Sequence, residues 1–407
     1  MNMQHPKATR AAGEILLKKF TPLMGLLYQD GRNTDRGPGM HHGVSMLSPY
    51  LRRRLITERD AVASALGAHG QLNAGKFIQE VIWRGYFKGW MECRPKVWAA
   101  YRDCLEVDLF RLEEDSSLRG KVDRAEGGGT GLACFDAWVQ ELVETGYLHN
   151  HARMWFASIW IFTFGLPWRL GADFFYRHLL DGDPASNTLS WRWVAGLHTR
   201  GKPYEAKAMN IAKYTDGRFA PLEKDLATDI QGLEYLEPKG LSDRQPLRDP
   251  LPPNPNTPTA LLITEEDCQS EGFESLSLDI RAAATLSGSH LRSPRDVSSQ
   301  VASFETGALA DAANRAGLEP EKMRADEFNG LVRLAERTGI RQIVTPYLPV
   351  GPLRDWFDEA TPALDAAGIT LAEWRRDWDT AIWPHATAGF FKVKKKIPLI
   401  LHEVGLT

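Results

Sequence analysis

The stretch LDGDPASNTLSWRW at residues 180–193 concentrates two Asp, one Asn and two Trp. We predict that it is a loop between bulky helices. Buried carboxylates need a cation, and Arg153 is the obvious candidate. Such a pair could hold the polar edge of a flat ring, although Asp-Gly-Asp-Pro could instead form an exposed turn. A calcium loop is a third option, but the spacing of an EF-hand is absent.

Arg153 lies in GYLHNHARMW at residues 146–155, next to the most apolar part of the chain. Polar groups in such a place must find partners or bind ligands. Helix capping by Asn150 is the plain alternative. This motif and residues 180–193 therefore form one candidate site.

The segment GVSMLSPYL at residues 43–51 places one Gly and two Ser before Pro49, which fits the first turn of a helix. Hydroxyls and free backbone N–H groups at a helix N-terminus suit a pyrophosphate. An ordinary Ser cap without a ligand is the alternative.

The segment FIQEVIWRGYF at residues 77–87 places Glu80, Trp83, Arg84 and Phe87 on one helix face. A carboxylate, an indole and a guanidinium there could grip a flat polar substrate. Equally, Glu80 and Arg84 could be an ordinary surface pair, with Trp83 in the core.

The composition is that of a globular protein of two domains, with 407 residues and 43% apolar side chains. The formal net charge of -3 gives no sign of nucleic-acid binding, although a local basic groove could exist. The four Cys lack zinc or CxxC spacing, so we expect reduced thiols in a cytoplasmic protein. No signal peptide is evident, and the apolar run from Met154 to Trp168 is too short to span a bilayer.

Residues 8–235 show helical periodicity, and we see no strand-like alternation before residue 230. The expected helices cover 11–27, 48–66, 73–92, 94–106, 133–147, 150–164 and 169–180. Residues 236–258 contain seven Pro and form an extended linker.

The remaining part, residues 259–401, reads as an α/β domain because strands alternate with helices. Strands are expected at 259–264 and 339–345, and a strand or a helix begins at 368–371. Helices are expected near 276–286, 304–316, 323–338 and 352–367.

Several segments, taken in order, resemble the FAD-binding half of photolyases and cryptochromes. They are Tyr28 and residues 43–51, 77–87, 145–154 and 180–193. The resemblance covers roughly residues 10–220. It implies an all-helical FAD-binding domain followed by a small Rossmann-like parallel-sheet domain. Familiar photolyases have the opposite domain order, so we expect a circular permutation. The segment GFFKVKKKIP at 389–398 resembles the end of their antenna domain, but any second antenna chromophore stays unknown.

The resemblance assigns cofactor contacts by matched position. Arg153 and Asp181 would form a salt bridge beside the flavin, Asp183 would contact the polar edge of the ring, and Asn187 would face flavin N5. Val44 stands where the family commonly has Thr, so one hydroxyl contact is lost. The expected FAD contacts are Tyr28, Val44, Ser45, Met46, Leu47, Ser48, Asn150, Arg153, Asp181, Asp183 and Asn187.

A tryptophan relay is also implied. Trp191 would lie next to the flavin and Trp168 would be the middle member. Trp98 is our candidate for the outer member, with Trp90 as the alternate and ordinary core packing of Trp98 as the competing interpretation.

On the substrate side, the family positions that hold a cyclobutane pyrimidine dimer match Glu80, Trp83, Asn150, Met154 and Trp193, with Arg84 beside them. Glu80 would hydrogen-bond the dimer and act as a catalytic group. The DNA phosphates would be gripped by basic side chains around the groove, although each could be an ordinary surface residue. The candidates are Arg52, Arg53, Arg54, Arg192, Arg200 and Lys202.

The function implied is blue-light-driven repair of UV-damaged DNA by electron transfer from reduced FAD. Asn187 favours repair over a cryptochrome-like photoreceptor, which is the alternative. A flavoprotein that uses the fold for an unrelated dark reaction is a third interpretation. We expect a monomer and no metal.

Overall fold

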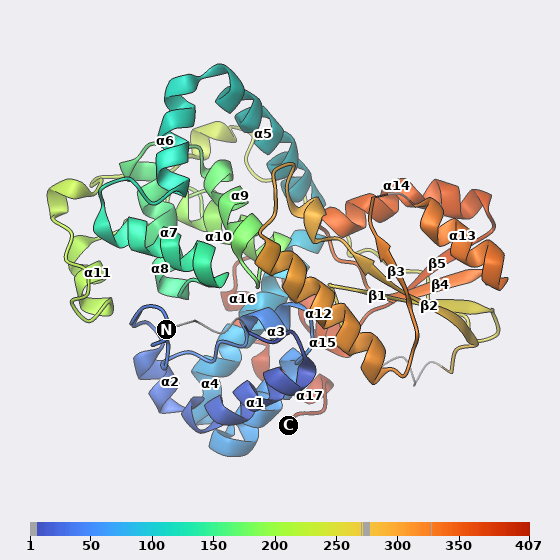
Figure 1. The fold of residues 1–407 in the computed structure, drawn as a ribbon. Coiled ribbons are helices and arrows are strands. Elements are labelled where there is room, and N and C mark those ends of the chain that lie inside the picture. The colour runs from blue at the N-terminus through green and yellow to red at the C-terminus, as the bar shows by residue number, and fades with distance from the viewer. Residues whose placement is uncertain (1–5, 270, 272–276, 327) are drawn as a thin grey trace.

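The computed structural model describes residues 6–269, 271, 277–326 and 328–407. A helical half and a five-stranded sheet flanked by helices lie side by side (Figure 1). The arrangement agrees with the predicted combination of an all-helical and an α/β part.

The helical half begins with α1 (Arg10–Phe20), α2 (Leu26–Gly31) and the short α3 (Ser48–Arg52). The long α4 (Glu58–Glu92) follows, with a capping box formed by Thr57 and Asp60. Gly70 interrupts α4 with a φ of 69°, a left-handed conformation that glycine adopts readily.

Seven further α-helices follow in this half. They are α5 (Pro95–Glu114), α6 (Ser116–Glu126), α7 (Ala133–Thr145), α8 (Asn150–Ser158) with a π turn (Ile159–Thr163), α9 (Trp168–His178), α10 (Pro184–Val194) and α11 (Ala208–Tyr214).

The prediction of a loop at residues 180–193 is wrong, because α10 begins at Pro184. Asp183 caps this helix: its Oδ1 accepts the Ser186 N–H at 2.8 Å. Proline fits the first turn because it has no N–H to satisfy there. The Asp-Gly-Asp-Pro sequence is therefore a helix start rather than an exposed turn.

The α/β half contains β1 (Thr259–Thr264), β2 (Ile280–Ser287), β3 (Glu321–Arg324), β4 (Gln342–Pro346) and β5 (Thr370–Trp374). The strands are parallel, in the order β3-β2-β1-β4-β5. The connecting helices are α12 (Ser299–Arg315), α13 (Asn329–Thr338) and α14 (Pro352–Ala366). The Rossmann-like sheet is thus confirmed.

Two helix predictions in this half are wrong. Residues 280–286, expected to be helical, belong to β2, because pairing with both β1 and β3 overrides the helical preference of its three alanines. Residue 276 lies outside the described residues. Residues 321–324 pair with β2, so the helix expected from 323 begins only at Asn329.

The two faces of β1 pack into different cores. Leu261 and Ile263 join the large core that continues into the helical half. Ala260 and Leu262 face a second core, shared with α13 and α14. The alternation is the period of two expected for a strand that is buried on both faces.

The segment after β5 returns to the helical half, although we predicted that the α/β domain extends to residue 401. It contains α15 (Asp377–Ile382), α16 (Phe391–Lys394) and α17 (Ile397–Glu403). Two glycines of α4 allow its close approach: a Cβ on Gly85 would lie 3.0 Å from Ile382, and one on Gly89 would lie 2.7 Å from Trp383.

Candidate functional site

Arg153 and Asp181 form an ion pair between α8 and the turn before α10. Arg153 Nη2 lies 2.9 Å from Asp181 Oδ2, and Arg153 Nε donates to the Leu148 carbonyl at 2.8 Å. Burial alone would raise the pKa of Asp181, but Arg153 and a hydrogen bond from Ser48 lower it below the usual value. The carboxylate is therefore ionised. We call Arg153 and Asp181 the clasp.

Asp183 is a second buried carboxylate beside the clasp. Its Oδ2 lies 3.4 Å from Lys88 Nζ, 3.6 Å from Arg84 Nη2 and 3.9 Å from Arg52 Nε. Burial would raise the pKa of Asp183, but Lys88, Arg84 and Arg52 together hold it far below the usual range. Asp183 thus carries a negative charge and caps α10 as well.

Several buried polar atoms at this place have no hydrogen-bond partner among the described residues. They are Asp181 Oδ1, Asp183 Oδ2, and Arg84 Nε and Nη2. Buried polar atoms are nearly always satisfied, so a bound group with both N–H donors and carbonyl acceptors would fit here. The polar edge of a flavin ring offers both.

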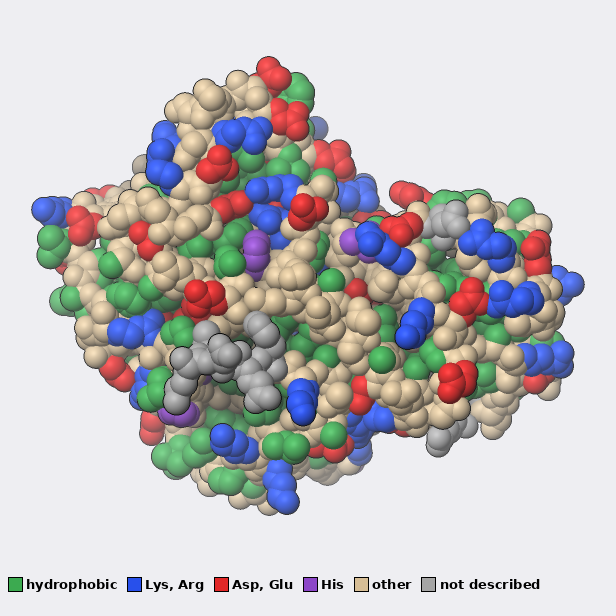
Figure 2. Space-filling model, viewed as in Figure 1, with side chains coloured by type: hydrophobic (Ala, Val, Ile, Leu, Met, Phe, Trp, Pro, Cys, Tyr) green, Lys and Arg blue, Asp and Glu red, His purple; other side chains and the backbone are tan. Residues whose placement is uncertain are grey.

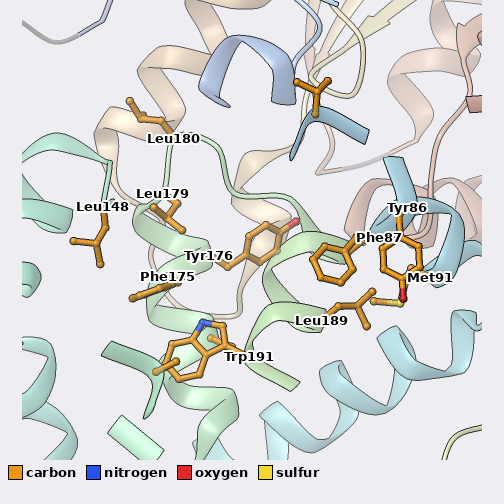
Figure 3. Close-up of a cluster of buried hydrophobic side chains, with 14 of the residues drawn as sticks. Tyr86, Phe87, Met91, Leu148, Phe175, Tyr176, Leu179, Leu180, Leu189 and Trp191 are labelled. Atoms are coloured by element: carbon orange, nitrogen blue, oxygen red, sulfur yellow. The ribbon is translucent and has the colours of Figure 1, made fainter. Parts of the chain in front are cut away.

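Asn187 and Trp191 follow Asp183 on α10, both buried. Asn187 Nδ2 donates to the Ala172 carbonyl at 2.8 Å, which fixes the amide against α9. The Trp191 ring lies 5.1 Å from the Phe175 ring (Figure 3). A Cβ on Gly171 would lie 2.3 Å from the Trp191 ring, so only glycine permits this contact.

The segment at residues 43–51 reaches the clasp through Ser48, which lies close enough to Asp181 to help lower its pKa. Ser45 Oγ accepts the Leu47 N–H at 3.3 Å, and Met46 has a φ of 56°, which is uncommon for a residue other than glycine. Val44 is half-buried and Leu47 is buried. Such strain concentrates at ligand-binding loops.

Tyr28 lies on α2 with its ring 5.3 Å from Phe77 of α4. Burial raises the pKa of its hydroxyl, and the nearby Glu80 carboxylate raises it further. Tyr28 therefore stays protonated and can donate a hydrogen bond.

The candidate substrate residues on α4 contact different partners. Glu80 Oε1 pairs with Arg32 at 3.2 Å and with Lys76 at 3.1 Å, so the expected alternative of a Glu80–Arg84 pair is not what forms. Arg84 turns instead toward Asp183. The Trp83 ring lies 3.7 Å from the Phe390 ring, which covers part of the indole.

The other candidate substrate residues lie on α8 and α10. Asn150 is exposed at the start of α8 and does not cap it, because His149 Nδ1 accepts the His151 N–H at 3.2 Å. Met154 is half-buried. Trp193 is half-buried with its ring 5.4 Å from Tyr204.

The candidate relay contains a residue that the sequence analysis missed. The Tyr101 ring lies 5.8 Å from the Trp168 ring and 5.4 Å from the Trp98 ring. Trp191 packs on Gly171, one helical turn from Trp168. Tyr101 follows Trp98 by three positions on α5, and this spacing on one helix face was the available signal.

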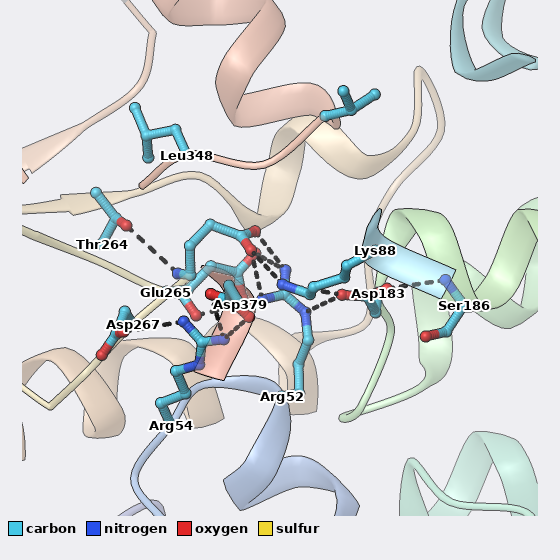
Figure 4. Close-up of polar contacts among 12 residues, drawn as sticks. Arg52, Arg54, Lys88, Asp183, Ser186, Thr264, Glu265, Asp267, Leu348 and Asp379 are labelled. Carbon is cyan, nitrogen blue, oxygen red and sulfur yellow. Dashed lines mark hydrogen bonds and ion pairs between the residues drawn. The ribbon is translucent and has the colours of Figure 1, made fainter. Parts of the chain in front are cut away.

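Four of the six candidate phosphate-binding cations are buried in ion pairs, so that prediction is wrong for them. Arg52 pairs with Glu266 at 2.6 Å and Arg54 with Asp379 at 2.7 Å (Figure 4). Arg53 pairs with Glu265, and Arg192 pairs with Glu237. Arg200 and Lys202 are exposed.

The buried charges around Arg52 and Arg54 join the two halves of the molecule. Because their partners come from the turn after β1 and from α15, we call this set the interdomain cluster. Its members are Arg52, Arg53, Arg54, Lys88, Glu265, Glu266, Asp267 and Asp379.

A third buried group of charges lies in the helical half. Asp35, His41 and Glu141 place possible ligand atoms within 4.8 Å of one another. His41 Nε2 lies 2.6 Å from Glu141 Oε1, and Arg218 Nη2 lies 3.2 Å from Asp35 Oδ2. His41 and Arg218 thus pair with one oxygen of each carboxylate, and we assign no metal to this group.

On the face shown in Figure 2, Lys and Arg side chains alternate with Asp and Glu. Within the part of the chain that the structure describes, no helix is both long and apolar enough to cross a membrane.

Comparisons with known proteins find similarity to photolyases over part of this chain. A family model for the FAD binding domain of DNA photolyase matches residues 77–219. A deoxyribodipyrimidine photo-lyase of Streptomyces griseus is 33% identical over 177 residues, which make up 43% of this chain and 36% of that protein. One of Vibrio cholerae is 33% identical over 166 residues, 40% of this chain and 35% of that protein.

A solved cryptochrome of Synechocystis superposes with a TM-score of 0.41 and 24% identity, over 53% of this chain and 46% of that chain. The chain thus spans about a third of the length of the curated relatives named above. The range matched by the family model contains the clasp, Asp183, Asn187 and Trp191. The helical half of this chain is therefore similar to the FAD binding domain of DNA photolyases.

Proposed function

We propose that this chain binds FAD at the clasp and uses blue light to split cyclobutane pyrimidine dimers in UV-damaged DNA. The observation that carries the proposal is the pair of buried carboxylates, Asp181 and Asp183, each with one oxygen that has no hydrogen-bond partner among the described residues, although Asp183 Oδ2 has ion pairs of 3.4–3.9 Å. They lie inside the range that matches the FAD-binding domain model. A protein that left these atoms without a ligand would lose free energy on folding.

The proposed FAD contacts divide into two groups. Asp181, Asp183 and Asn187 would hold the ring, and the fixed amide of Asn187 offers hydrogen bonds without a readily lost proton. Tyr28, Val44, Ser45, Met46, Leu47 and Ser48 would hold the phosphates, with Asn150 near the edge of the site. Reduced FAD would supply the light-driven electron that splits the dimer.

The proposed substrate contacts are Glu80, Trp83, Arg84, Asn150, Met154 and Trp193. A damaged base pair is less costly to unstack, so the dimer could be flipped out of the duplex. Glu80 would stabilise the negative charge that develops on the dimer, by a hydrogen bond. Exposed Arg200 and Lys202 would contact phosphates.

One observation favours a second candidate, a photoreceptor without repair activity. Glu80 is already paired with Arg32 and Lys76, and Phe390 lies against Trp83. Repair would require these contacts to open. A receptor would keep them closed.

We do not propose an antenna chromophore in the crevice at the carboxyl ends of β1 and β4, where sheets of this order bind ligands. Glu265 and Glu266 leave β1 directly into the interdomain cluster. After β4, the Tyr347 hydroxyl and the Val350 N–H both donate to Glu92, each at 2.6 Å. Protein side chains therefore occupy this crevice.

The test is to load the full chain with FAD, reduce the flavin under blue light, and measure dimer loss from irradiated single- and double-stranded DNA. Repair that falls sharply in Glu80→Gln but not in Glu144→Gln, an exposed control, would support the proposal. Bound FAD with light-induced flavin reduction and no repair would favour the receptor. A chain that binds no FAD would contradict both.

A further inference from the structure

An aromatic path leads from α9, which packs against α10 of the candidate flavin site, to the boundary between the two halves. Trp168, Tyr101 and Trp98 are buried, and consecutive ring centroids lie 5.8 Å and 5.4 Å apart. The start of α5, which carries Trp98, lies beside the start of α14 (Figure 1). The path therefore ends against the α/β half.

The ends of this path differ in hydrogen bonding. Among the described residues, no acceptor meets Trp191 Nε1, Trp168 Nε1 or the Tyr101 hydroxyl, and all three atoms are buried. Trp98 Nε1, by contrast, donates to Asp355 Oδ2 of α14 at 2.7 Å. The same oxygen accepts from Arg102 at 2.9 Å.

We propose that Asp355 is the proton acceptor that traps the oxidised end of the relay at Trp98, an inference that rests on the proposed flavin photochemistry. Bound, light-excited FAD would take one electron from the relay, and the electron vacancy would then move outward to Trp98. The Trp98 cation radical then transfers its Nε1 proton to Asp355 Oδ2. The products are a neutral indolyl radical and a protonated carboxyl group.

The step balances. One electron leaves Trp98 and reaches FAD, and one proton moves over a preformed hydrogen bond to Asp355. A soluble thiol then returns an electron to the radical, and the proton returns from Asp355. The inner ring groups cannot lose a proton in this way, because no acceptor meets them, so the vacancy does not stop there.

Two features strengthen Asp355 as a base for this step. Burial raises the pKa of Asp355, with Trp98 and Arg102 acting in the opposite direction. The carboxylate also stabilises a positive charge on the neighbouring indole by electrostatics.

The alternate outer member, Trp90, has the opposite surroundings. The Arg94 guanidinium lies 4.4 Å from its ring centroid, and a cation so close disfavours a cation radical on the indole. We therefore assign the outer position of the relay to Trp98 rather than to Trp90.

The experiment compares wild type with Asp355→Asn, by transient absorption after a flash on the full chain loaded with oxidised FAD. We expect conversion of the cation radical to the neutral radical to slow roughly tenfold or more in Asp355→Asn, because the base is lost. The matched control is Asp365→Asn, on the same helix with an exposed side chain, and it should behave as wild type. In wild type, deuterated solvent should slow the same conversion.

Two further variants separate the proton-transfer role from a structural one. Asp355→Glu restores a carboxylate and should recover much of the wild-type rate. Tyr101→Phe keeps the ring without the hydroxyl and should leave the conversion unchanged. In the protein without FAD, the Trp98 indole N–H resonance should move upfield in Asp355→Asn as the hydrogen bond to the carboxylate is lost.

Conversion at the wild-type rate in Asp355→Asn would overturn this inference and leave the proposed repair function untouched. Normal radical kinetics without dimer repair would contradict the repair function alone.

Discussion

The clasp and the interdomain cluster are two buried charged sites that meet at Asp183, yet their charges are satisfied differently. In the cluster, Arg52 makes two hydrogen bonds to the Glu266 carboxylate, and Arg54 makes two to Asp379. At the clasp, Asp181 Oδ1 has no hydrogen-bond partner among the described residues, and Asp183 Oδ2 beside it has only ion pairs of 3.4–3.9 Å. The carboxylates of the cluster thus complete their hydrogen bonds within the protein, although Arg53 Nε and Nη2 do not, whereas the carboxylates at and beside the clasp leave hydrogen-bonding capacity for a ligand.

The largest effect should follow from breaking the cluster. Arg54→Ala leaves Asp379, Glu58 and Asp267 without their shared cation, and removal of one partner from a buried pair costs about 3–5 kcal/mol. Denaturant unfolding should show this loss in the free energy of unfolding. The matched control is Arg337→Ala, which breaks an exposed pair with Glu321 and should cost less than about 1 kcal/mol. Equal losses would refute the structural role of the cluster.

The next effect should separate binding from folding. Arg153→Ala removes the cation of the clasp, and truncation of one partner in a buried charge pair weakens binding by roughly 2–5 kcal/mol. FAD affinity, measured by titration calorimetry, should therefore fall at least about tenfold. Unfolding of the FAD-free protein should change less than in Arg54→Ala. Unchanged FAD affinity would mean that the clasp is structural like the cluster.

Acid should weaken both sites together. Burial raises the pKa of Asp181, Asp183 and Asp267, but neighbouring cations outweigh it and lower each below its usual value. A carboxylate with a lowered pKa stabilises the fold above its unfolded-state pKa, and this contribution is lost as pH falls toward the folded-state pKa. We therefore expect the melting temperature to fall once the pH is lowered below about 4. A melting temperature that stays constant from pH 6 to about pH 3 would contradict the assigned charge states.

The contrast between the clasp and the interdomain cluster also explains which site the sequence could predict. The clasp was predictable, because Arg153 and Asp181 lie in motifs dense with polar and aromatic residues. The role of Arg52, Arg53 and Arg54 was misjudged as phosphate binding. Three consecutive arginines resemble an exposed basic patch, and their partners Glu265, Glu266 and Asp379 lie more than 200 positions away in the chain.

The Trp98–Asp355 hydrogen bond could not be predicted from the sequence either, because the two residues are 257 positions apart and lie in different halves. The sequence did contain a signal for the helix start at Pro184. Asp before Pro is an N-terminal signal, but the density of polar residues after it suggested a loop.

The smallest predicted effect lies on the phosphate side of the proposed FAD site. Val44 is half-buried beside the strained Met46, at a position where the resembling family commonly has Thr. Val44→Thr keeps the branched shape and adds one hydroxyl, and a new hydrogen bond contributes about 0.5–1.5 kcal/mol. FAD affinity should rise a few-fold, with Val143→Thr on the exposed face of α7 as the matched control. Because the unfolding free energy without FAD should not change, a gain confined to the FAD-bound protein would indicate that residues 44–48 contact the cofactor. A weaker affinity would instead mean that Val44 packs against the core and that the phosphates lie elsewhere.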